Sequence, residues 1–188
     1  MSESTKERFL RESLQLFASR GYEAVGVQEI VEAAGVTKPS MYHHFGSKRG
    51  LLDALLQTRY EGLFTLLTQA VRYDGDLPLT LLKTAQAFFT FAHEEPSFYR
   101  MQLSMWASGP DSTSRLAIAP FFERQHQTLE DLFISVVKDH GNLRGHHVTY
   151  AITFLGILNG YITSVSTGYT DEIVRKSVKQ FMYGIYAL

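Results

Sequence analysis

The sequence predicts an all-α protein. Apolar residues recur three and four positions apart along most of the 188 residues, and this spacing places them on one face of a helix. Glycine, proline and small polar residues interrupt the periodic stretches at short intervals, as expected for turns between helices. No alternation of apolar and polar residues is long enough to predict a strand. We therefore expect helices joined by short loops throughout the chain.

The composition predicts a packed protein and excludes several classes. Apolar residues make up 45% of the chain and charged residues 20%, and the net charge is −1, so a uniformly basic nucleic-acid binder is excluded but a local basic patch is not. Cysteine is absent, which removes disulfide scaffolds, thiol catalysis and cysteine metal sites. The sequence offers no secretory signal and no apolar segment of transmembrane length, so we expect a cytoplasmic protein.

Three short helices are expected in the first 46 residues. Ser4 and Glu7 have the spacing of a capping box, in which a hydroxyl and a carboxylate satisfy two free N–H groups at the start of a helix. That helix ends at Gly21, and its apolar stripe comprises Phe9, Leu10, Leu14, Phe17 and Ala18. A second helix is expected over about 27–34, and a third begins after Thr37.

Longer helices are expected in the rest of the chain. Their predicted ranges are about 48–72, 78–93, 96–107, 113–139, 146–167 and 171–187, with glycine, proline and aspartate at the breaks. Pro120 is expected to kink or to start the helix in its region.

The turn Gly35-Val36-Thr37 joins two of the short helices, as in a helix-turn-helix. In that motif the second helix enters the major groove of DNA. Met41 and Phe45 are four residues apart and would pack inward. The polar side of the second helix would present Thr37, Lys38, Ser40, Tyr42, His43 and His44. The alternative is a purely structural helical hairpin; a metal pair at the adjacent His43 and His44 is disfavoured, because neighbours on a helix diverge.

These residues resemble the DNA-binding half of TetR/AcrR-type transcriptional regulators. The resemblance covers about the first 55 residues. It is carried by Phe17, Gly21-Tyr22, Val27-x-x-Ile30, Ala33-Ala34-Gly35-Val36, Lys38, Met41 to Phe45 and Ser47-Lys48 ahead of Leu51-Leu52. The remaining chain agrees with the family in length, helical character and helix count.

The resemblance implies roles for the residues of the motif. Thr37, Tyr42 and Lys48 would bind phosphate, Lys38 and Ser40 would face base edges or flanking phosphates, and His43 would lie at the groove, with Pro39 in the same surface. It implies a DNA-binding domain over 1–46 and a ligand-binding and dimerisation domain over 47–188. Gly26 and Gly50 depart from the family, which usually has a hydroxyl residue and often a glutamate at these positions.

Residues 60–126 contain eleven aromatic residues, with Met101 and Met105 among them. Such side chains can form an ordinary core or line an apolar pocket. As a set they match the ligand cavity that the resemblance implies. The residues expected near a pocket are Phe64, Phe88, Met105, Trp106 and Phe122, with Gln102, His126 and Asn159 as polar anchors. No charged partner stands out, so we expect a small, mostly apolar or aromatic effector.

Residues 145–170 contain no Asp, Glu, Lys or Arg, and the helix from Tyr150 to Ile162 is apolar on nearly all sides. A helix of this kind is buried all round, either as the central helix of a monomer or between two chains. We expect a homodimer interface, as the resemblance also implies. It would be formed by Phe154, Gly156, Ile157, Gly160 and Tyr161 together with Val178, Phe181 and Ile185 of the last helix.

These observations predict a ligand-responsive DNA-binding regulator, most simply a repressor that a small apolar molecule releases from a palindromic operator. The fold class is an amino-terminal three-helix helix-turn-helix domain followed by a carboxyl-terminal helical ligand-binding and dimerisation bundle. The sequence has no H-E-x-x-H, P-loop, G-x-S-x-G or G-x-G-x-x-G motif, and its single Glu123-x-x-His126 pair is only one of the two that a di-iron site needs. The alternative is a helical bundle that acts as an enzyme or interaction protein without binding DNA.

Overall fold

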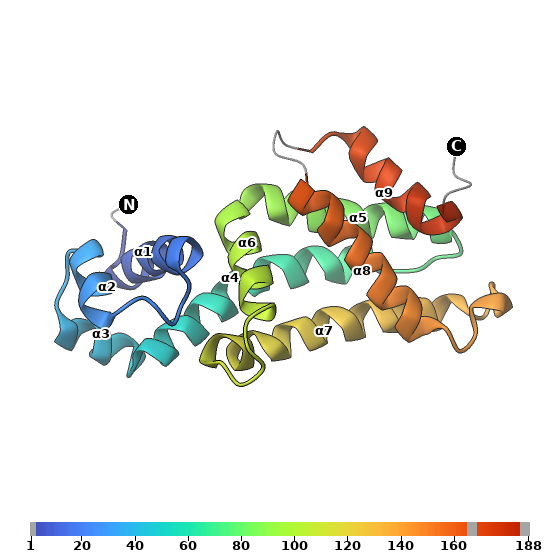
Figure 1. Cartoon of the computed structure of the whole chain (residues 1–188). Coiled ribbons are helices and arrows are strands. Elements are labelled where there is room, and N and C mark those ends of the chain that lie inside the picture. The colour runs from blue at the N-terminus through green and yellow to red at the C-terminus, as the bar shows by residue number, and fades with distance from the viewer. Residues whose placement is uncertain (1–2, 165–168, 185–188) are drawn as a thin grey trace. The chain divides into compact units, whose positions relative to one another are not determined.

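The structure is a computed structural model that describes residues 3–164 and 169–184, and within these ranges it contains helices and no strand. The prediction of an all-α fold is confirmed. Figure 1 shows the order of the elements along the chain. They are α1 (Thr5–Arg20), α2 (Val27–Ala33), α3 (Lys38–Phe45), α4 (Lys48–Ala70), α5 (Leu77–Glu94), α6 (Pro96–Trp106), α7 (Thr113–Val136), a 3-10 turn η1 (Gly141–Leu143), α8 (His147–Ser164) and α9 (Asp171–Tyr183).

The predicted helices agree with the observed ones to within a few residues at each end, except that the predicted ends at 167 and 187 lie outside the described residues. The capping box at the start of α1 is present: the Glu7 N–H donates to the Ser4 hydroxyl at 3.2 Å, and the Ser4 N–H donates to the Glu7 carboxylate at 2.7 Å. Pro120 lies inside α7 and does not start it, since the helix begins at Thr113.

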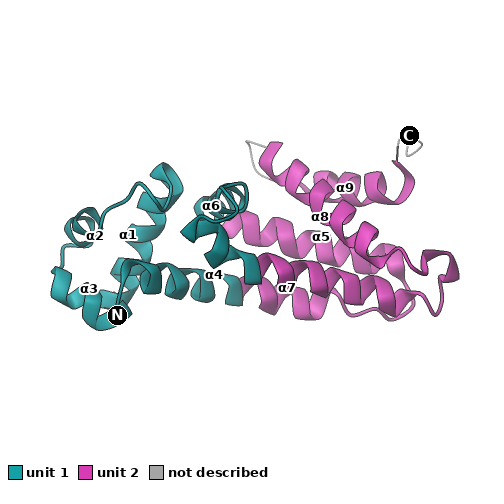
Figure 2. Ribbon diagram, turned by 60° about the horizontal axis from the view of Figure 1, so that its bottom comes forward, with its two compact units in different colours: residues 1–61, 95–120 teal, residues 62–94, 121–188 magenta. Residues whose placement is uncertain are grey.

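The chain forms two compact units, coloured separately in Figure 2. The first comprises residues 1–61 and 95–120, and the second comprises 62–94 and 121–188. The helices α4 and α7 each begin in the first unit and end in the second. The first unit therefore extends beyond the three short helices, and it includes α6 and the first turns of α7.

The core of the first unit is built around α1. Phe9 and Phe17 of α1 are buried together with Met41 of α3 and Leu51 of α4. The ring of Phe9 meets the ring of Phe45 edge-on, with centroids 5.6 Å apart. The helix α1 contacts both α2 and α6. The three short helices therefore share one apolar core, which fixes the orientation of α3.

The second unit has its own core, to which α5, α7, α8 and α9 contribute. The rings of Phe133, Phe154 and Phe181 pack together, and the centroids of Phe154 and Phe181 are 4.8 Å apart. The buried hydroxyls of Thr84 and Ser177 donate to carbonyl oxygens of their own helices, at 2.8 Å each. The polar groups in this core are thus satisfied locally.

Gly50 lies in the first turn of α4, where its N–H donates to the Ser47 hydroxyl at 2.9 Å. A Cβ atom at position 50 would lie 2.0 Å from the carbonyl oxygen of Phe45, which is far inside van der Waals contact. The close approach of α3 to α4 therefore requires glycine here.

Gly50→Ala is expected to lower the free energy of unfolding by about 1–3 kcal/mol, because the backbone of Phe45 must move to admit a methyl group. Gly62→Ala in the same helix is the matched control. Its Cβ would meet only Phe91, at 3.8 Å, so it should stabilise the protein by about 0.5–1 kcal/mol through helix propensity. Urea denaturation measures both, and equal effects of the two substitutions would contradict the steric explanation.

Candidate DNA-binding helix-turn-helix

The helices α2 and α3 form the motif that the sequence predicts. Gly35, in the turn between them, has a φ of +64°, a left-handed conformation that glycine adopts without strain. Thr37 caps α3, because its hydroxyl oxygen accepts a hydrogen bond from the Ser40 N–H at 3.4 Å. Met41 is fully buried on the inner side of α3. The motif is therefore closed by a glycine turn, capped by a hydroxyl and fixed by one apolar side chain.

The opposite side of α3 faces solvent. Thr37, Lys38, Pro39 and His43 are exposed, Ser40 is half-buried, and the side chain of Tyr42 is 48% exposed although it is large and aromatic. The structure thus brings these six predicted residues together on one surface, which we call the α3 surface. An exposed tyrosine among hydroxyl and ammonium groups suits hydrogen bonding to phosphates and base edges.

The start of α2 lacks a capping side chain because position 26 is glycine. The N–H of Gly26 instead donates to the Glu29 carboxylate at 2.9 Å, and Arg20 also pairs with Glu29. The hydrogen bond from Gly26 and then the one from Arg20 lower the pKa of Glu29. Glu29 thus supplies the carboxylate half of a capping box, and the hydroxyl half is missing because position 26 is glycine.

Lys48 was also predicted to bind phosphate, but its ammonium has a partner within the protein. Its Nζ donates to the carbonyl oxygen of Tyr22 at 2.6 Å and lies 4.1 Å from the centre of the Tyr22 ring. Desolvation lowers the pKa of Lys48 and outweighs the opposing effect of Glu23 and Glu29. This hydrogen bond therefore links the loop before α2 to the start of α4.

Glu23 makes a contact that could not be predicted from any sequence pattern. Its carboxylate accepts hydrogen bonds from the N–H of Ser114 at 3.0 Å and from the Ser114 hydroxyl at 2.6 Å. Desolvation acts to raise the pKa of Glu23, but these hydrogen bonds outweigh it, and the pKa is lowered. The two residues are 91 positions apart, so no local pattern connects them.

The predicted ligand-binding residues are divided between the two units. In the first unit Gln102 and Met105 are buried, Gln102 accepts a hydrogen bond from the Tyr60 hydroxyl, and the guanidinium of Arg115 lies over the ring of Trp106. In the second unit the predicted residues are Phe64, Phe88 and Phe122, which are buried, and His126 and Asn159, which are half-buried. Their role in ligand binding stays a prediction.

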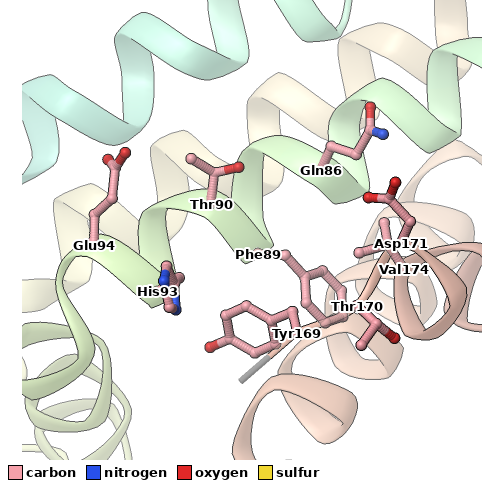
Figure 3. Close-up of a pocket in the computed structure, with 9 residues that line it drawn as sticks. All are labelled: Gln86, Phe89, Thr90, His93, Glu94, Tyr169, Thr170, Asp171 and Val174. Atoms are coloured by element: carbon pink, nitrogen blue, oxygen red, sulfur yellow. The ribbon is translucent and has the colours of Figure 1, made fainter. Parts of the chain in front are cut away.

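A pocket in the second unit is lined by other residues (Figure 3). It has a volume of about 210 Å³ and lies between α5 and the start of α9. The ring of Tyr169 meets Phe89 edge-on, with centroids 4.8 Å apart, and lies 5.9 Å from His93. Glu94 and Asp171 also line it. Within residues 3–164 and 169–184, no cluster of three or more His, Asp or Glu residues could hold a metal ion.

The predicted dimer residues separate into two groups. Phe154 and Val178 are buried inside their own unit, so they belong to its core and not to a surface that a partner could cover. The others are Gly156 and Gly160, which are exposed, and Ile157, Tyr161 and Phe181, which are half-buried; Ile185 lies outside the described residues. Ile152, which the prediction omitted, is 54% exposed on α8.

Comparisons with known proteins agree with this description. The sequence model of the family described as "Bacterial regulatory proteins, tetR family" matches residues 9–55, a segment that contains the whole helix-turn-helix. The chain is 39% identical over 87 residues to the HTH-type transcriptional activator FasR of Mycolicibacterium smegmatis, a match that covers 46% of this chain and 40% of FasR. It is 30% identical over 119 residues to the HTH-type transcriptional repressor KstR2 of Mycobacterium tuberculosis, covering 63% of this chain and 56% of KstR2.

The chain therefore spans about half the length of these two curated relatives. A solved structure extends the likeness further. The TetR family transcriptional regulator PfmR from Thermus thermophilus superposes with a TM-score of 0.74, at 25% identity, over 95% of this chain and 98% of PfmR. In the described ranges, no helix combines the length and the hydropathy needed to cross a membrane.

The motif and the helical architecture define an all-α helix-turn-helix protein. More specifically, its amino-terminal region matches the tetR family model over residues 9–55, and its fold is similar to that of PfmR over 95% of this chain.

Proposed function

We propose that the protein is a ligand-responsive repressor that binds a near-palindromic operator as a homodimer and leaves it when a small, mostly apolar molecule binds. The single observation that carries DNA binding is the α3 surface, a set of exposed polar side chains on a helix whose other side is fixed by Met41. Of the two curated relatives, FasR is named as an activator and KstR2 as a repressor; the proposed direction of regulation follows KstR2, whose match covers more of this chain.

In the proposed complex α3 lies in the major groove, one copy in each half-site, with half-sites about 34–36 Å apart or a small multiple of this. Lys38, at the first position of α3, reaches phosphates or base edges near the helix start. Tyr42 and His43 follow along the same exposed side. Lys48 donates one hydrogen bond to the carbonyl oxygen of Tyr22, and its two other N–H donors can bind a phosphate in the proposed complex.

Lys38→Ala tests the groove assignment. The substitution should weaken binding to a duplex that the wild-type protein selects from a random library, and it should reduce the salt dependence of binding by about one unit because one phosphate contact is lost. Fluorescence anisotropy at several salt concentrations measures this. Lys83→Ala, at an exposed position of α5, makes the same charge change and should leave the slope unaltered. Equal slopes for the two variants, or no duplex binding by the wild type even at low salt, would refute the assignment.

The proposed homodimer uses the exposed face of α8. Ile152, Gly156 and Gly160 are four residues apart and follow one another along this face. The absence of charge from residues 145–170 removes the electrostatic cost of covering it. The two glycines would let a partner helix approach closely, and a two-fold axis would pair the face with its own copy.

Ile152→Glu should convert the dimer into a monomer, because a pair of carboxylates would be buried at the two-fold interface. Sedimentation velocity over a range of protein concentrations measures the change. Ile134→Glu is the matched control, since Ile134 is 50% exposed on α7 and outside the proposed interface. A dimer that survives Ile152→Glu as fully as it survives Ile134→Glu would contradict the assignment.

The proposed effector acts by binding more tightly to a conformation that no longer matches the operator. The chain has a single tryptophan, Trp106, which is one of the predicted pocket residues, so its fluorescence reports directly on that region. In a panel of apolar compounds, those that change this fluorescence should weaken operator binding, and operator should weaken their binding by the same factor. A compound that binds tightly yet leaves operator affinity unchanged would contradict the mechanism.

A further inference from the structure

The loop between α1 and α2 is held from two directions within the first unit. Glu23 accepts hydrogen bonds from the N–H and the hydroxyl of Ser114, in the first turn of α7. The carbonyl oxygen of its neighbour, Tyr22, accepts a hydrogen bond from Lys48, the first residue of α4. The loop therefore contacts the starts of two helices that are distant in sequence.

These two helices are the ones that pass between the units. The helix α4 crosses from the first unit to the second after Glu61, and α7 crosses after Pro120. A rearrangement of either helix in the second unit can therefore reach the Tyr22-Glu23 loop along a continuous backbone. The same loop leads directly into α2, which contacts α3.

The contact with α7 is built from fixed groups. Ser114 is almost completely buried, and its hydroxyl lies 3.2 Å from that of Ser108 and 3.3 Å from that of Ser112. These neighbours restrict its rotation. The backbone N–H of Ser114 is one of the free donors in the first turn of a helix, where a carboxylate is favoured by the helix dipole. Glu23 thus meets two preorganised donors at the positive end of a 24-residue helix.

We propose that Glu23 is a positioning residue for operator binding, which holds the helix-turn-helix on the first turn of α7 in its DNA-competent arrangement. Lys48 also holds the loop, from the first turn of α4, through its hydrogen bond to the carbonyl oxygen of Tyr22. This inference rests on the proposed DNA-binding function. It adds the two hydrogen-bonded contacts by which α4 and α7 hold the loop before α2.

The direction in which one substitution changes the affinity for DNA distinguishes this proposal from simple electrostatics. DNA is an anion, so removing a carboxylate from the DNA-binding region should tighten binding if charge alone matters. If Glu23 positions the motif, its removal weakens specific binding instead. Glu32 gives the matched control, because it is exposed on α2 and its carboxylate accepts a hydrogen bond from Gln28 of the same helix.

The experiment compares Glu23→Ala with Glu32→Ala in the full chain. Affinity is measured by fluorescence anisotropy for the duplex selected by the wild-type protein and for a scrambled duplex of equal length. Glu23→Ala should weaken binding to the selected duplex by about 5- to 20-fold, in the range of typical coupling between sites. Its binding to the scrambled duplex and its salt slope should stay unchanged, whereas Glu32→Ala should bind both duplexes as well as the wild type or better.

Three further variants test the hydrogen bonds themselves. Glu23→Gln keeps an acceptor oxygen and should recover part of the affinity. Ser114→Ala should weaken specific binding, and adding it to Glu23→Ala should weaken binding no further, because both remove one interaction. Lys48→Ala should also weaken specific binding, because the hydrogen bond to the carbonyl oxygen of Tyr22 is lost.

Stoichiometric titration gives the active fraction of each variant, so a loss of folded protein is not mistaken for a loss of affinity; if Glu23→Ala does not fold, Ser114→Ala decides the outcome. The inference is overturned if Glu23→Ala behaves as Glu32→Ala does, or if selected and scrambled duplexes lose affinity equally. If the wild-type protein binds no duplex, the proposed function itself is overturned. This outcome is distinct from the comparison of variants, which tests only the role of Glu23.

Discussion

The shortness of α2 and α3 is the constraint on which the DNA-binding half depends. These helices have seven and eight residues, well below the length of about 12–15 at which isolated helices become stable in water. Their stability must come from packing, and the buried side chain of Met41 together with the Phe9–Phe45 ring contact supplies it. Because α3 is held from its inner side alone, its outer side is free to carry hydrogen-bonding groups.

The two long helices α4 and α7 each contribute continuous backbone to both units. Both α4 and α7 begin beside the helix-turn-helix and end in the unit that contains α5, α8 and α9. The loop at Tyr22 and Glu23 receives one hydrogen-bonded contact from the start of each. The proposed regulation therefore requires only small shifts of whole helices, without unfolding any element.

Most of the fold could be predicted because its signals are local. Periodic apolar residues, caps and glycine breaks indicate the helices, and the glycine turn with Met41 facing inward indicates the helix-turn-helix. The contact of Glu23 with Ser114 could not be predicted, because it joins residues that only the tertiary fold brings together. On α8 the pattern could not separate the buried Phe154 from the exposed Ile152, because a helix that is apolar all round has no polar side to orient it.

Gly50 also limits how this protein can be recombined with its relatives. The backbone of Phe45 occupies the space that a side chain at position 50 would need, so these two positions are sterically coupled where α3 meets α4. A chimaera that takes its recognition helix from one regulator and its long α4 from another would bring a side chain into that joint whenever the donor of α4 lacks the glycine. Exchange of DNA specificity in this scaffold is therefore best made with a crossover beyond Gly50, so that the segment from Phe45 to Gly50 comes from a single parent.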